Sequence, residues 1–392
     1  MAVVKHFAVL VVLLPICTSA LAEPVPIEAM TNPSKHAWDL FLALNYPAKN
    51  PAVERGVPDP QKALGDDGLT VWETWKHGEE VFLANGAPPP KWEDMSLDPS
   101  LVPNGKKLFE IPKTLVLEGV RSGMSPDQAV RADQVSKVLK VAPDGIFRRG
   151  GGETRMNRST FDFIVEKELY NIEGQEALYA KIVSRTEQAV SFPVDSIEVK
   201  AMWTPLEPSD DRSHFHLSVG ADAKSYKLVA LHIITKDVPN WFWTSFRQTD
   251  GPEPEIPSVD TYGQPGLLQG TKWQFYELSG TQTDFTDGMG RPTYLSDPHV
   301  EEGFQNSSCI SCHALSTIGR KGPKGADGSS EPEANRIAFF NVMGSPTGAP
   351  VGVPNPGWFF EPVRFGQDVQ DQDYIQLDFL FSPAFRANRK SP

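Results

Sequence analysis

Apolar residues change their spacing near residue 191, and this change constrains the possible folds more than any other feature of the sequence. Upstream, segments such as residues 33–44 and 159–170 carry apolar side chains three or four positions apart, which is typical of amphipathic helices. Downstream, apolar and polar residues alternate, which predicts β-strands. The sequence therefore predicts a helical first half and a second half built around an antiparallel sheet.

The individual elements follow from these two periods and from the proline-containing turns between them. Helices are expected over residues 33–44, 69–83, 125–141 and 159–170. Strands are expected over residues 197–203, 214–219, 228–234, 241–246 and 273–278. The 35 prolines among 392 residues are about twice the usual share, which favours many loops and short elements.

Residues 1–22 have the composition of a secretory signal peptide. Lys5 lies in a short basic start, an apolar run covers residues 7–16, and small residues precede the expected cleavage after Ala22. The run is too short to span a bilayer, and no later stretch approaches that length. A lipid anchor on Cys17 is disfavoured because Ile16, rather than a small residue, precedes it. We therefore expect export into an oxidising compartment, with no membrane span.

The charge balance bears on the class of partner. The chain has 37 Lys and Arg against 50 Asp and Glu, a formal net charge of −13. Nucleic-acid binding needs a basic field to contact phosphates, so this balance argues against a nucleic-acid partner. An acidic surface instead favours association with a basic partner protein through electrostatic steering.

Two cysteines remain once the signal peptide is set aside, and they lie close together in the sequence. Cys309 and Cys312 are separated by two residues, and His313 follows directly. This C-x-x-C-H pattern is typical of covalent haem c attachment. Two thiols on one helical turn reach the two vinyl groups of the porphyrin, and the adjacent imidazole then serves as the proximal iron ligand. A covalent haem c, together with export, places the expected protein in the periplasm of a Gram-negative bacterium.

Three other interpretations of the cysteine pair compete with haem attachment. A structural zinc site needs four ligands, and the mature chain has no further cysteine to complete it. A thioredoxin-like redox pair is expected where a strand leads into a helix, whereas the residues before Cys309 look like the end of a helix. A disulfide across two residues would close almost no loop and would stabilise little.

The last hundred residues resemble the small class I c-type cytochromes. An aromatic residue, Phe304, precedes the cysteine motif, and Gly322-Pro323 follows His313. The resemblance implies that the Pro323 carbonyl accepts a hydrogen bond from the free N–H of His313, which orients the imidazole. It also implies a C-terminal helix, for which residues 374–387 are the candidate, although Pro383 interrupts them. The expected fold class is therefore α+β, with a helical and antiparallel β domain over residues 23–280 and a small, mostly α, haem domain over residues 281–392.

The second axial ligand of the expected haem is the open question of the sequence. No histidine follows His313, and Met343 is the only methionine after the motif, so Met343 is the candidate ligand from the same domain. The alternative is that Met343 fills the core beside neighbouring phenylalanines. His299, Met289 or a residue of the upstream domain are further candidates. An iron with both axial positions occupied by protein ligands can only transfer electrons, whereas an iron with an open axial position can bind and transform a small molecule.

Several upstream residues are candidates for chemistry but have plainer explanations. His214 and His216 would face the same way on a strand, as paired metal ligands do, but a polar, solvated strand face is the favoured explanation because the sequence shows no third ligand. His232 is expected to be a hydrogen-bonded core histidine. The aromatic pair Trp241 and Trp243 fits either a core or a position near the haem. The carboxylates Asp284, Asp287 and Asp297 match no defined calcium loop.

Most of the mature chain also resembles a group of bacterial secreted proteins that carry one C-terminal haem c. The resemblance rests on four segments: residues 200–203, 231–233, 240–243 and 280–282. It implies an architecture and no substrate. We therefore expect a periplasmic mono-haem cytochrome that transfers electrons to or from a redox partner. The alternatives are a haem c oxidoreductase with an open sixth position, acting on a small molecule bound against the upstream domain, and a haem-based sensor.

Overall fold

The computed structural model describes residues 28–94, 151–219, 224–301, 305–319, 351–356, 359 and 374–390. The expected signal peptide, the expected helix over residues 125–141, Pro323 and Met343 lie outside the described residues.

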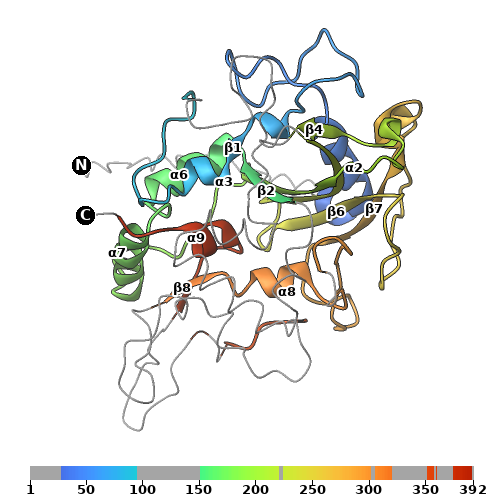
Figure 1. Cartoon of the computed structure of the whole chain (residues 1–392). Coiled ribbons are helices and arrows are strands. Elements are labelled where there is room, and N and C mark those ends of the chain that lie inside the picture. Colours follow the sequence, from blue (N-terminus) through green and yellow to red (C-terminus); the bar gives the residue numbers. More distant parts are fainter. Residues whose placement is uncertain are drawn as a thin grey trace, which may run out of the picture.

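A seven-stranded antiparallel sheet dominates the described part of the chain (Figure 1). The strands run in the order β1-β2-β3-β5-β6-β7, with β4 paired to β5. Their bounds are β1 Lys76–His77, β2 Gly151–Met156, β3 Ile197–Pro205, β4 Leu217–Val219, β5 Ser225–Thr235, β6 Phe242–Gln248 and β7 Tyr276–Gln282. A second, two-stranded sheet pairs β8 Thr317–Gly319 with β9 Tyr374–Gln376. The strands predicted over residues 197–203, 228–234 and 241–246 are confirmed as β3, β5 and β6.

Helices are few and mostly short, and this overturns the expected fold class. The described residues contain seven α-helices: α1 Glu28–Thr31, α2 Pro33–Leu44, α3 Gly78–Val81, α6 Arg158–Glu166, α7 Ile172–Val183, α8 Cys309–His313 and α9 Phe381–Arg386. Only α2, α6 and α7 have seven or more residues. The protein is mainly an antiparallel sheet, so the expectation of a helical upstream part with a helical cytochrome-like domain was wrong.

Two predicted helices fail for identifiable reasons. Residues 69–83 form a 3₁₀-helix at Trp72–Thr74, then β1, then α3. The edge strand β1 pairs with β2, so this stretch is part of the sheet. Residues 374–387 begin as β9, which pairs with β8, and only their last part is the helix α9. The backbone between them has positive φ at Asp378 and Phe379, which no continuous helix permits.

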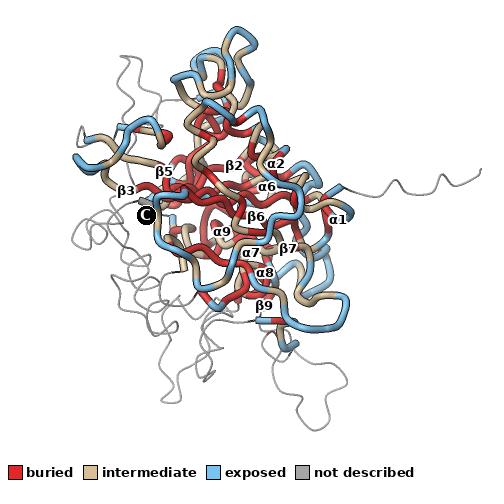
Figure 2. Tube along the Cα trace, turned by 90° about the vertical axis from the view of Figure 1, so that its right-hand side faces the viewer, coloured by how far each residue is buried: buried red, intermediate tan, exposed pale blue. Residues whose placement is uncertain are grey.

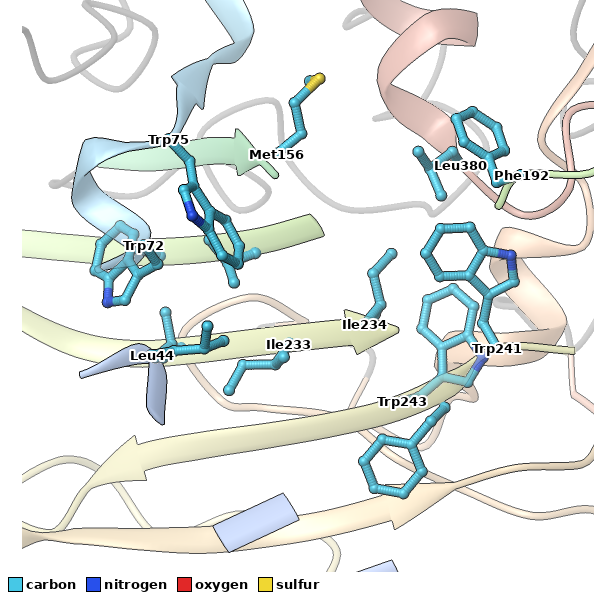
Figure 3. Close-up of a cluster of buried hydrophobic side chains, with 14 of the residues drawn as sticks. Leu44, Trp72, Trp75, Met156, Phe192, Ile233, Ile234, Trp241, Trp243 and Leu380 are labelled. Atoms are coloured by element: carbon cyan, nitrogen blue, oxygen red, sulfur yellow. The ribbon is translucent and has the colours of Figure 1, made fainter. Parts of the chain in front are cut away.

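One face of the main sheet packs against α2. The aromatic ring of Phe246 on β6 contacts two residues of this helix, with ring centroids 4.9 Å from Trp38 and 4.4 Å from Phe41. The buried residues are concentrated along the central strands (Figure 2). Ile233 and Ile234 leave β5 on opposite sides, and Trp241 lies with Phe192 and Leu380 near the start of β6 (Figure 3). Both faces of the sheet are therefore covered.

The opposite face carries α8 and α9, which lie on the same side of the sheet in Figure 1. Strand register identifies the side chains of this face. Glu198, Ile234, Trp243 and Gln282 form one row across β3, β5, β6 and β7, and Lys200, His232, Ser245 and Gly280 form the next row. Residues two apart on a strand share a face, so both rows face the same way. We call these eight residues the haem-motif face.

A single buried core cluster joins the sheet to the segment around α8. Ile310, Leu315 and Ile318 from this segment belong to the same cluster as Trp243 and Leu231 of the sheet. The boundary near residue 280 between two domains stays a prediction. Within the described residues no helix is long and apolar enough to cross a membrane.

Candidate functional site

Helix α8 consists of the cysteine motif itself. Ser308 caps its N-terminus, with its side chain accepting a hydrogen bond from the backbone N–H of Ser311. The side chains of Cys309 and Cys312 are three positions apart in the helix, so they lie on neighbouring positions of one helical surface. His313 is the last helical residue. This is the local arrangement that the sequence motif predicts.

Gln282 at the end of β7 fixes α8 to the sheet. Its amide nitrogen donates to Oγ of Ser308 and Oγ1 of Thr293, each at 3.0 Å, and its amide oxygen accepts from the backbone N–H of Ile310 at 3.3 Å. Ile310 is the second residue of α8, and its side chain is fully buried. The side chain of Gln282 therefore hydrogen-bonds both the capping residue Ser308 and the backbone N–H of Ile310, which has no carbonyl partner within the helix.

The imidazole of His313 is held by one hydrogen bond and two aromatic contacts. Nδ1 donates to the backbone carbonyl of Phe379 at 2.8 Å. The ring centroid lies 4.5 Å from that of Trp243 and 4.7 Å from that of Phe381. Since a carbonyl can only accept, the proton is on Nδ1, and Nε2 keeps its lone pair.

The Phe379 carbonyl belongs to a tight turn with an unusual backbone. Asp378 and Phe379 have φ values of 49° and 71°, in the left-handed region that non-glycine residues rarely adopt. The Asp378 carboxylate accepts from Nζ of Lys236 at 2.6 Å and from the backbone N–H of Phe192 at 2.7 Å. These contacts hold the turn, and with it the carbonyl, against the main sheet.

Neither Cys309 nor Cys312 forms a disulfide, and both side chains are half-buried. Sγ of Cys309 donates to the carbonyl of Leu295 at 3.2 Å. Burial raises the pKa of Cys309 well above its usual value and that of Cys312 to about 12. Reactive thiols in redox pairs have lowered pKa values, so this environment disfavours the thioredoxin-like alternative.

The haem-motif face brings titratable groups to the cysteine motif. Lys200 interacts electrostatically with Cys309 and Glu301, and His313 interacts with both Lys200 and His232. Lys200 is exposed to solvent, whereas burial raises the pKa of Glu301 to about 8. The motif therefore lies against a polar and titratable part of the sheet.

The structure separates most of the other candidates that the sequence singled out. His214 ends a short 3₁₀-helix and stacks on Phe275, whereas His216 is buried and bonds Glu73 at 2.9 Å. The two histidines therefore do not form a pair, because residue 214 is not in a strand. Asp287 pairs with Arg291, away from the buried Asp297. Among the described residues, no group of three or more His, Cys, Asp or Glu side chains is placed to hold a metal ion.

Sequence reasoning missed two residues that position the motif. The resemblance assigned the hydrogen bond of His313 to the carbonyl of Pro323, whereas in the structure the carbonyl of Phe379 accepts it. The sequence pattern also gives no sign that the side chain of Gln282 attaches α8 to the sheet. A backbone carbonyl leaves no side-chain signature, so no local signal identifies Phe379. Trp243, considered as a residue near the haem, does contact His313.

Comparisons with known proteins add no assignment. No protein-family model, no curated protein and no solved structure matches the chain significantly.

Proposed function

We propose that the protein is a periplasmic mono-haem c-type cytochrome that transfers electrons, with haem bound covalently through Cys309 and Cys312. His313 is its proximal ligand. The observation that carries the proposal is the hydrogen bond from Nδ1 of His313 to the backbone carbonyl of Phe379, with both cysteines of the motif on the same short helix as His313. A C-x-x-C-H sequence alone is a motif, and this bond is the orienting contact that such a ligand requires.

The chemistry of the donor set fits a haem. Burial lowers the pKa of His313 to about 3, so the imidazole is neutral and its Nε2 lone pair is available to a metal. The raised pKa values keep both cysteines as thiols, and each S–H would supply the sulfur and the hydrogen that add across one vinyl group. When bound, haem supplies a one-electron couple whose potential the protein sets through its ligands and surroundings.

The surroundings of His313 suit a carrier whose geometry changes little. Trp243 and Phe381 pack against the imidazole, and the Phe379 carbonyl fixes its rotation. Trp243 is 2% exposed, so it keeps water from this side of the ring. A ligand held by packing and by one hydrogen bond keeps the same position in both oxidation states, which favours electron transfer.

A second candidate function is a haem c oxidoreductase with an open sixth position. Glu301, with a pKa of about 8, interacts electrostatically with both cysteines of the motif. A carboxyl with such a shift is suited to proton transfer at neutral pH. This candidate requires a small molecule to bind against the haem-motif face.

Mass spectrometry and a carbon monoxide titration test the proposal. The full chain is produced in a bacterium that exports it and attaches haem c. The tryptic peptide containing Cys309 and Cys312 should carry the mass of one haem, and Cys309→Ala/Cys312→Ala should lose it. An unmodified wild-type peptide would overturn the proposal. Ferrous protein that resists carbon monoxide supports electron transfer, whereas rapid binding supports the oxidoreductase.

A further inference from the structure

We propose that His232, on the central strand β5, supplies the second axial nitrogen to the iron. The inference rests on the proposed haem attachment and deepens it, because it assigns the sixth ligand to the main sheet rather than to Met343. The observations that carry it are the position of His232 on the haem-motif face, its unpartnered ring nitrogen and the carboxylate near it.

The strand register places His232 beside the cysteine motif. His232 pairs with Lys200 on β3 and with Ser245 on β6. The neighbouring row of the same face contacts the motif directly, since Trp243 packs on His313 and Gln282 binds the cap of α8. His232 also interacts electrostatically with His313. His232 and His313 therefore lie on the two sides of one interface, that between the sheet and α8.

The imidazole of His232 is buried without the hydrogen bond that buried imidazoles normally make. It is 9% exposed, and its Nε2 has no hydrogen-bond partner in the structure. The hydroxyl of Ser245, directly across the ladder and fully buried, also has none. An unsatisfied buried polar atom destabilises the folded state, because it has lost its hydrogen bonds to water without replacing them. A metal ligand bond would remove that cost, so the position is suited to a ligand rather than to a core histidine.

A carboxylate near His232 resembles the outer shell of a metal-binding histidine. Asp297 is fully buried, and its Oδ2 has no partner. It interacts electrostatically with His232. Ligating histidines commonly use their second nitrogen to bind a carboxylate, directly or through water. Burial lowers the pKa of His232 to about 4, which keeps the ring neutral, as ligation requires.

The neighbouring candidates are less suited to the iron. The ring edge of His299 that carries Nε2 packs against Gly251, where Cε1 and Nε2 lie 2.8 and 3.1 Å from the position that a Cβ would take. Lys200 reaches solvent and would have to lose its proton before binding. His232 is therefore the group of the haem-motif face that could bind the iron without first losing a proton or a hydrogen bond.

Spectroscopy of the haem-loaded full chain tests the assignment without an activity assay. The ferric wild type should show the near-infrared magnetic circular dichroism of two imidazole ligands. His232→Met should replace it with the charge-transfer band of an iron–thioether bond and raise the reduction potential, because methionine ligation favours the ferrous form. Met343→Leu and His299→Ala are matched controls that should leave the wild-type spectrum unchanged. His232→Gly should bind carbon monoxide, and added imidazole should restore the wild-type spectrum.

The results that would contradict the assignment of His232 can be distinguished from those that would contradict haem attachment. A thioether band in the wild type that Met343→Leu abolishes would overturn the assignment and make Met343 the ligand. A high-spin wild type that binds carbon monoxide at once would overturn it in favour of an open site. Covalent haem is present in both cases, so the proposed function survives them. A wild-type peptide without haem would overturn the proposed function, and this inference with it.

Discussion

Nδ1 of His313 donates a hydrogen bond to the carbonyl of Phe379, 66 residues further along the chain, at 2.8 Å. The bond joins the last residue of the cysteine-motif helix to a turn that the main sheet holds in place. Asp378 forms this connection, because its carboxylate binds Lys236, the residue that follows β5. The orientation of the imidazole therefore depends on a buried ion pair that lies outside the motif.

Asp378→Asn tests that dependence. Lys236 and Asp378 have side chains that are 9% and 8% exposed, and removing one partner of such a buried pair costs about 3–5 kcal/mol. Asparagine tolerates the left-handed backbone, so the loss measures the ion pair rather than backbone strain. Urea unfolding followed by circular dichroism should show this decrease in the free energy of unfolding. In the haem-loaded protein the reduction potential should also rise, because a weaker bond to Nδ1 lowers the donor strength of His313.

The double variant Lys236→Met/Asp378→Asn serves as its control. Removing both charges leaves no unpaired lysine in the buried site, so this variant should regain part of the stability that Asp378→Asn loses. Equal stability of the wild type and Asp378→Asn would show that the pair does not hold the turn.

Gln282→Leu should loosen α8 from the sheet. The substitution leaves the buried backbone N–H of Ile310 without its partner and removes a donor to Ser308, which predicts a loss of about 1–3 kcal/mol. It should also lower the fraction of exported protein that carries haem, because the thiols are then less well positioned. Chemical unfolding and the ratio of haem to protein absorbance measure the two effects. The same substitution at the exposed Gln376, which makes one bond to the Ala314 carbonyl, is the matched control and should cost less than about 1 kcal/mol.

The central strands were predictable because their signal is local. Residues 197–203 and 228–234 alternate or form apolar runs, and β3 and β5 lie where those patterns predict them. The helix over residues 33–44 is likewise confirmed as α2, which begins at Pro33. In these segments the preferences of neighbouring residues agree with the tertiary packing.

The segment after the motif was not predictable from such patterns. Apolar residues from Tyr374 to Phe385 suggested a helix, but β9 pairs with β8 and the turn at Phe379 satisfies His313. Both contacts join residues far apart in the chain, and one ends on a backbone carbonyl. The motif supplies the three residues of the proposed site, whereas the partners that position them, Gln282 and Phe379, depend on the tertiary fold.

Stability should fall as the pH rises from about 5 to about 8, because buried carboxyls have raised pKa values. Burial raises the pKa of Glu198 to about 7 against a usual value of 4.5, so the folded protein binds this proton more tightly than the unfolded chain. The resulting stabilisation is complete below pH 4.5 and is lost as the pH rises through 7. Glu153, with a pKa of about 7, and Glu301, with a pKa of about 8, act in the same direction.

The substitution Glu198→Gln measures how much Glu198 contributes to the pH dependence of the free energy of unfolding. Glutamine carries no titrating proton, so the decline in the free energy of unfolding between pH 5 and pH 8 should be smaller by at most about 3 kcal/mol. Urea midpoints measured across this range for the wild type and the variant give the comparison. Parallel pH profiles would show that Glu198 titrates at its usual pKa and is not desolvated in the folded protein.

Electron exchange with a basic partner should slow as salt is added. The chain has a net charge of −13, and an attractive field raises the association rate most when screening is weak. Between about 10 mM and about 150 mM ionic strength the Debye length falls from about 30 Å to about 8 Å, so the second-order rate constant should drop about tenfold or more. Stopped-flow reduction of the haem-loaded protein by a basic redox protein measures this constant. A neutral small reductant is the control and should react at a rate nearly independent of salt. A rate constant that rises with ionic strength for the basic protein would show that the surface around the haem is not the acidic one that the net charge predicts.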